Sequence, residues 1–120
     1  MKPHVATGLL VALLVCGASW TTAQTDGRPR SGQQIYEESC FRCHGVNGKG
    51  DGPDAASLIV RPANFHRVSI RSKSDFELLA TLQYGLAFSP MHGWRGRLSD
   101  EEMSEVIAYI RTMAPYRPAL

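Results

Sequence analysis

Length, composition and charge place this chain among ordinary single-domain proteins. It has 120 residues, of which 43% are hydrophobic and 20% charged, and its formal net charge at pH 7 is +2. A charge so close to neutral excludes binding through a large basic surface, so no nucleic-acid partner is expected.

The N-terminal segment predicts a secretory signal peptide rather than part of the fold. Lys2 supplies a basic start, an apolar run covers at most residues 8–18, and the small residues at 21–23 suit a cleavage site. An uncleaved anchor is disfavoured because this run is short for a membrane span. A lipid anchor at Cys16 is disfavoured because valine precedes it where a small residue is expected. We therefore expect residues 1–23 to be removed and the mature chain to have no stable membrane insertion.

The remaining sequence divides into three parts. Residues 24–30 contain glycine and proline without an apolar period, and they predict a flexible lead-in. Residues 31–115 carry the helical periodicity and predict one domain. Residues 116–120 are expected to form a C-terminal tail.

A first helix is predicted over residues 31–40. Ile35, Tyr36 and Ser39 recur at helical spacing and share one face. Gly32 lies one turn before Tyr36, and this pairing of a small with an aromatic residue predicts a close crossing with another helix.

The sequence Cys-Phe-Arg-Cys-His at residues 40–44 is the motif most informative about function. Two thiols at this spacing can each add to one vinyl group of the same porphyrin, and the next residue can ligate the iron, so C-x-x-C-H is the attachment signature of a c-type haem. A thioredoxin-like redox pair, half a zinc site and a disulfide are the alternatives. No strand-then-helix context, second C-x-x-C or H-x-x-x-H accompanies the motif. We therefore predict one covalently bound haem c, held by Cys40, Cys43 and His44.

The glycine-rich segment at residues 45–53 predicts a loop. It lacks the Lys-Ser/Thr pair and the preceding strand of a phosphate-binding P-loop, and its acidic residues lack EF-hand spacing. A short helix is predicted within residues 54–60, with Leu58 and Ile59 in the core. An extended turn follows at residues 61–65, because proline disfavours helix in the residue before it.

Two further helices are predicted by capping boxes. Residues 74–77 and 99–102 both have the pattern Ser-x-x-Glu, in which the serine and glutamate side chains bond to the first backbone N–H groups of a helix. The first of these helices is expected to stop at Gly85 and the second before Pro115. The apolar residues expected to face the core are Phe76, Leu79 and Leu82 with Leu78 beside them, and Met103, Val106, Ile107 and Ile110. No strand pattern is convincing, so the predicted fold class is all-α.

Met91 is the predicted second ligand of the iron. It lies in a loop between the two later helices, with Pro90 before it and Gly93 after it to turn the chain. It is far enough from His44 for the chain to reach the opposite face of a haem. A loop thioether is the usual second ligand of an electron-carrying cytochrome c.

Two other methionines and two histidines compete with Met91. Met103 and Met113 lie on the last predicted helix, where packing explains them. His66 and His92 are most simply surface residues, although His92 is adjacent to the predicted ligand. We hypothesise that Met91→Ala converts the site to His92 ligation or to an open iron. A variant that kept the native ferric spectrum would exclude Met91 as a ligand.

Taken together, these motifs resemble a small class I cytochrome c. The resemblance extends from Ser31 to Met113, and it rests on the haem motif, Gly52-Pro53, Pro90-Met91 and the Leu-Ser-Asp-Glu-Glu … Ala-Tyr-Ile-Arg pattern of the last helix. It implies an all-α fold of three to five helices wrapped around one haem. It further implies thioether bonds at Cys40 and Cys43, axial ligation by His44 and Met91, and a crossing of the first and last helices near Gly32, Tyr36 and Tyr109.

The resemblance also implies that a proline carbonyl accepts a hydrogen bond from the proximal histidine. Pro53 and Pro62 both suit this role, and Pro53 is favoured because Gly52 precedes it. The sequence departs from the family pattern in the ligand loop, where proline precedes Met91 and His92 follows it.

An exported electron carrier is the function that these features predict. Iron held by the same two ligands in both oxidation states changes geometry little, and a thioether ligand raises the reduction potential. The expected partners are a redox protein donor and acceptor, which meet the haem edge through a small transient interface. Trp94, Arg95 and Arg97 either rim that edge or are ordinary surface residues. The expected location is the periplasm of a Gram-negative bacterium.

Two alternative functions remain open. The chain could be a haem subunit docked on an oxidase, reductase or dehydrogenase. It could also be a haem enzyme or gas sensor in which Met91 is labile.

Overall fold

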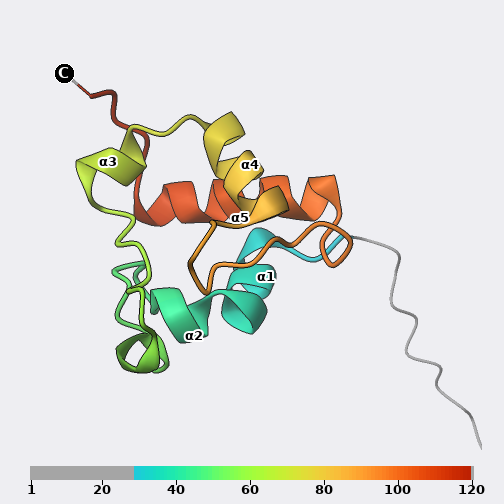
Figure 1. Ribbon diagram of the computed structural model, residues 1–120. Coiled ribbons are helices and arrows are strands. Elements are labelled where there is room, and N and C mark those ends of the chain that lie inside the picture. The colour runs from blue at the N-terminus through green and yellow to red at the C-terminus, as the bar shows by residue number, and fades with distance from the viewer. Residues whose placement is uncertain (1–28, 120) are drawn as a thin grey trace, which may run out of the picture.

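The computed structural model describes residues 29–119, so the predicted signal peptide and most of the predicted lead-in lie outside the described residues. Five α-helices and one 3-10 helix form within this range (Figure 1). They are α1 (Gly32–Ser39), α2 (Phe41–His44), η1 (Ala55–Ser57), α3 (Val68–Arg71), α4 (Asp75–Tyr84) and α5 (Asp100–Met113). The described residues contain two isolated β-bridges and no strand, which confirms the all-α prediction. None of the helices in this range combines the length and the hydropathy that a membrane crossing requires.

Each of the three longer helices begins with a capping box. Ser74 caps α4 with Glu77, and Ser99 caps α5 with Glu102, as predicted. Ser31 caps α1 in the same way, with a glutamine in place of the glutamate. Gly85 follows α4 at a φ of 73°, a left-handed conformation that glycine adopts without steric cost.

The first and last helices cross in contact with each other (Figure 1). A side-chain carbon at Gly32 would overlap the backbone carbonyl of Glu105 on α5, so only glycine allows this approach. One turn further along α1, the rings of Tyr36 and Tyr109 lie with their centroids 5.4 Å apart. The predicted crossing is therefore present.

The core lies around this crossing. Its most deeply buried large side chains are Tyr36, Ile35, Met103 and Val106. From α4, Leu82 is buried, and Leu78 and Leu79 pack against the core at its edge.

Two of the predicted core residues are instead exposed. Phe76 is 77% exposed, because it lies in the first turn of α4, where the neighbouring side chains are also in solvent. Ile59 is 100% exposed, because the helix predicted at 54–60 is reduced to the three residues of η1 and the chain after it leaves the core.

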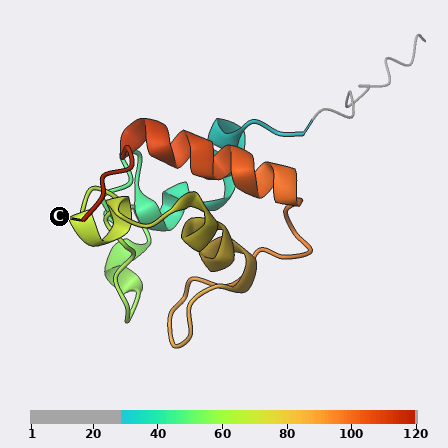
Figure 2. The same ribbon diagram turned by 90° about the horizontal axis from the view of Figure 1, so that it is seen from above.

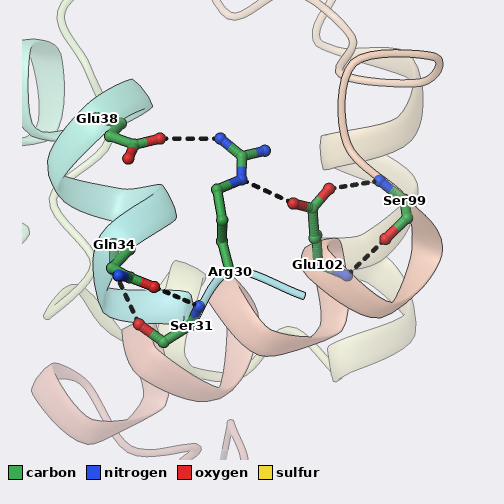
Figure 3. A network of polar contacts seen from close by, with 6 residues as sticks. All are labelled: Arg30, Ser31, Gln34, Glu38, Ser99 and Glu102. Carbon is green, nitrogen blue, oxygen red and sulfur yellow. Dashed lines mark hydrogen bonds and ion pairs between the residues drawn. The ribbon is translucent and has the colours of Figure 1, made fainter. Parts of the chain in front are cut away.

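Arg30, which lies just before α1, forms ion pairs with both crossing helices (Figure 3). Its guanidinium donates to Glu38 on α1 and to Glu102 on α5, both at 2.8 Å. Glu102 also accepts from the backbone N–H of Ser99 at 3.0 Å. The hydrogen bond from Arg30, followed by that from Ser99, lowers the pKa of Glu102 below its ordinary value of 4.5.

We predict that Glu102→Gln lowers the free energy of unfolding at pH 7. Glutamine keeps the capping hydrogen bonds but loses the charge that pairs with Arg30. A carboxylate whose pKa is lower when folded stabilises the fold above its unfolded pKa, and the effect disappears as the pH falls through the folded value. The gap between wild type and variant in urea unfolding should therefore be full well above pH 4.5 and should close as the pH falls through the lowered folded pKa.

Glu101→Gln is the matched control, because Glu101 lies in the same first turn of α5 with an exposed side chain. Its effect on urea unfolding at pH 7 should be small. A gap for Glu102→Gln that persisted unchanged at pH 3 would contradict the assigned ion pair.

Candidate functional site

A cavity of about 330 Å³ lies between the crossing helices and the shorter elements. Its wall is mainly aliphatic and aromatic, with contributions from α4, α5 and the loops between the helices. The structure brings Cys40, Cys43, His44 and Met91 to this one cavity. Such a wall fits a mostly apolar group, to which these four side chains offer two thiols, an imidazole and a thioether.

The two cysteines reach the cavity from a single turn of chain. Cys40 ends α1 and begins α2, and Cys43 lies within α2, whose four residues are held by the bond from the His44 N–H to the Cys40 carbonyl at 2.9 Å. Both thiols are free and half-buried. Burial, with a smaller contribution from Cys43, raises the pKa of Cys40 to about 12. This thiol is therefore protonated at neutral pH, which disfavours a thioredoxin-like redox pair.

The imidazole of His44 is oriented by two neighbours. Its Nδ1 lies 3.2 Å from the carbonyl oxygen of Ala63, and its ring stacks on Phe65 with centroids 4.6 Å apart. Burial lowers the pKa of His44, and the hydrogen bond to Ala63 opposes this shift. A neutral ring that donates from Nδ1 to Ala63 leaves Nε2 as the nitrogen available to a metal.

The expectation that Pro53 supplies this carbonyl is corrected by the structure. The oxygen belongs to Ala63, which follows the other candidate, Pro62, in the extended segment. Gly52 is instead packed against α2: its N–H donates to the Cys43 carbonyl at 3.2 Å, and a side chain there would overlap the carbonyl of Arg42. Pro53 itself is exposed.

Ala63 and Phe65 are site residues that the sequence analysis does not identify. Both lie in the run Arg-Pro-Ala-Asn-Phe at residues 61–65, which the sequence predicts only as an extended turn.

The glycine-rich loop and the residue after it hold α2 through backbone hydrogen bonds. The N–H of Gly50 donates to the His44 carbonyl, and the N–H of Asp54 donates to the Arg42 carbonyl, both at 2.9 Å. The Arg42 side chain pairs with both carboxylate oxygens of Asp54, at 2.7 and 2.8 Å. From the core, the buried hydroxyl of Tyr36 donates to the Gly45 carbonyl at 2.7 Å. The carbonyls of so short a helix are satisfied in this way.

Met91 reaches the cavity from the loop between α4 and α5. The N–H of Leu86 donates to the Met91 carbonyl at 2.8 Å, and the Met91 N–H donates to the Ser89 hydroxyl at 3.0 Å. A β-bridge between Gly85 and His92 closes the loop at its base.

Among the competing ligands, only His92 also lines the cavity. Its ring lies 4.6 Å from that of Trp94, and its Nδ1 is 3.0 Å from the Gly93 carbonyl. His66 is exposed and contacts the Asn47 carbonyl instead. Met103 is buried in the core around the α1–α5 crossing.

Comparison with known proteins gives consistent matches. Residues 30–114 match the family described as Cytochrome c. The chain is 28% identical over 107 residues to the cbb3-type cytochrome c oxidase subunit FixPc of Rhizobium leguminosarum bv. viciae, covering 86% of this chain and 33% of the relative. It is 26% identical over 82 residues to the corresponding subunit FixP of Bradyrhizobium diazoefficiens, covering 68% of this chain and 26% of the relative. The chain thus spans a third or less of the length of these curated relatives.

A solved structure shows the same fold. A chain of the reducing HAO-like protein complex of Kuenenia stuttgartiensis superposes with a TM-score of 0.64 and 30% sequence identity, covering 72% of this chain and 46% of that chain.

We predict that Tyr36→Phe destabilises the folded protein by roughly 1–3 kcal/mol, because the buried Gly45 carbonyl loses its donor. Burial raises the pKa of this hydroxyl, so it remains a donor at neutral pH. The denaturant midpoint measures the effect. Tyr84→Phe is the control. Tyr84 is 68% exposed and its hydroxyl accepts a hydrogen bond from Arg95, so its loss should change the free energy of unfolding by less than about 0.5 kcal/mol. Equal midpoints for the two variants would show that the Tyr36 hydrogen bond contributes nothing.

Proposed function

Because the chain belongs to the cytochrome c family, a family of electron-transfer haem proteins, we propose that it is an exported single-haem cytochrome that passes one electron at a time between redox partners. The observation that carries this proposal is the convergence of Cys40, Cys43, His44 and Met91 on one apolar cavity. A bound haem iron supplies one-electron chemistry between its ferric and ferrous states.

Four residues would hold the haem, in different roles. Cys40 and Cys43 attach it through thioether bonds, which fixes its position relative to α2. His44 presents Nε2 toward the metal, since its Nδ1 is engaged with Ala63. Met91 supplies a thioether sulfur, which raises the reduction potential relative to a second imidazole. The apolar wall limits the access of water to the site.

A role as a subunit is the second candidate, and the relatives favour it. FixPc and FixP are named as oxidase subunits, and the solved neighbour belongs to an HAO-like complex. The domain present here makes up a third or less of those oxidase subunits. We propose that the chain meets the same class of partner, a larger redox complex, either as a mobile carrier or as a docked component. The predicted signal peptide supports a periplasmic location.

The first experiment asks whether the pigment is covalent and carries one electron. Acid acetone should leave the colour with the purified protein, and a potentiometric titration should follow a single one-electron Nernst curve. The double variant Cys40→Ala/Cys43→Ala should be colourless or lose its colour to the solvent. A colourless wild-type protein, or a wild-type pigment that acid acetone extracts, would refute the proposal.

We further predict that Met91→Leu abolishes the sulfur-to-iron charge-transfer band at the red end of the ferric spectrum. Leucine conserves the side-chain volume but cannot ligate. Met113→Leu is the control, since Met113 is half-buried but does not line the cavity, and it should keep the band. Retention of the band in Met91→Leu would assign the second ligand to another residue, with His92 next in line.

A further inference from the structure

Helix α3 forms part of the cavity wall without the support of another helix. Among the helices of the described range, it is the only one whose backbone lies beside no other helix. It has no side-chain cap, and none of its four residues is buried. Ile70 nevertheless lines the cavity from this helix, as does Lys73 shortly after it. Contacts from elsewhere in the chain must therefore hold this part of the wall in place.

The C-terminal segment supplies the first of these contacts. The Arg71 Nε donates to the Pro115 carbonyl at 2.9 Å, and the Arg117 N–H donates to the Arg71 carbonyl at 3.0 Å. The two bonds run in opposite directions between the same two stretches, so together they fix the end of α3 against the segment after α5. Figure 2 shows this segment running beside α3, in agreement with Figure 1.

Arg111 of α5 holds the turn that follows α3. Its guanidinium donates to the Lys73 carbonyl and, at 2.8 Å, to the carboxylate of Asp75. The Arg111 side chain is only 15% exposed, and its guanidinium carbon lies 5.6 Å from the centroid of the Tyr116 ring. The contacts of Arg111 and those of Arg71 thus meet at one C-terminal segment. We call Arg71, Arg111, Pro115, Tyr116 and Arg117 the C-terminal clamp.

The clamp is directly connected to the site. Ala114 lies between its members Arg111 and Pro115, is 2% exposed and lines the cavity. Displacement of α3 or of the segment that holds it would therefore open the wall and admit water. Ferric haem carries one more positive charge than ferrous haem, and water stabilises the more highly charged form. Access of water to the site therefore lowers the reduction potential.

We propose that the C-terminal clamp is a positioning device for the haem site, which keeps α3 closed over the cavity and thereby keeps the reduction potential high. This proposal rests on the proposed function, and it gives a role in the redox chemistry to residues outside the four candidate ligands. Arg71 and Tyr116 are positioning residues in it, because Arg71 acts through α3 and Tyr116 acts through Arg111.

The test compares Arg71→Met with Arg67→Met in the purified haem-containing protein. Both changes remove one positive charge, but Arg67 is the exposed N-cap residue of α3 and does not belong to the clamp. Arg71→Met should speed hydrogen exchange at the Ser72 and Lys73 amides roughly fivefold, as expected for the loss of one hydrogen bond, and should leave α1 unchanged. Its reduction potential in a potentiometric titration should fall below that of Arg67→Met.

Two further variants keep the charge of the clamp. Tyr116→Leu removes the ring beside Arg111 without changing any charge, and it should lower the reduction potential in the same direction as Arg71→Met. Arg71→Lys retains a positively charged donor at this position, and it should recover part of the potential that Arg71→Met loses.

Three results would overturn the proposal. Unchanged hydrogen exchange in Arg71→Met would show that the clamp does not hold α3. Equal potentials in Arg71→Met and Arg67→Met would reduce the effect to the lost charge, and faster exchange without a change in potential would make the clamp a purely structural contact. Failure of the proposed function looks different, because a wild-type protein without a covalent pigment has no one-electron curve to shift.

Discussion

The close crossing of α1 and α5 is the constraint on which the rest of the structure depends. Gly32 lets the two backbones touch, and Ile35, Met103 and Val106 fill the contact beside it. The packed core therefore lies around one pair of helices. The remaining elements add a few side chains to that core, such as Leu82 of α4, and they surround the cavity. A short chain buries limited surface by itself, so a bound apolar group at its centre would complete the hydrophobic interior.

Tyr36 connects this crossing to the site. Its ring meets Tyr109 across the helix contact and Phe65 on the other side, with the second pair of centroids 6.5 Å apart at 66°. Phe65 in turn stacks on His44, and the Tyr36 hydroxyl holds the Gly45 carbonyl. The orientation of the candidate ligand is thus set by aromatic packing that begins in the core. Because these contacts share residues, their energetic contributions are not additive.

The features that could be predicted from the sequence are those whose interacting residues lie within about one turn of each other. Capping boxes and the C-x-x-C-H motif place their interacting groups three or four residues apart, so spacing alone identifies them. The partner of His44 could not be predicted this way, because Ala63 acts through its backbone and any residue type has a carbonyl. Apolar periodicity predicted that Phe76 and Ile59 are buried, but it cannot tell whether a face meets a neighbour. The four residues of α3 have no side-chain cap to signal them.

The two sides of the cavity are stabilised in different ways. His44 lies on α2. Its carbonyl accepts a hydrogen bond from the glycine-rich loop, its ring stacks on Phe65, and Tyr36 donates to the carbonyl of the next residue. Met91 packs against the edge of the core, but residues 85–90 before it are held by backbone hydrogen bonds between exposed or half-buried residues. Moving residues 85–90 would break few apolar contacts, whereas displacing His44 would disrupt the aromatic packing of the core. It follows that changes in residues 85–90 can alter the Met91 side of the cavity without unfolding the domain, while the position of His44 is secured from the side that the core supports.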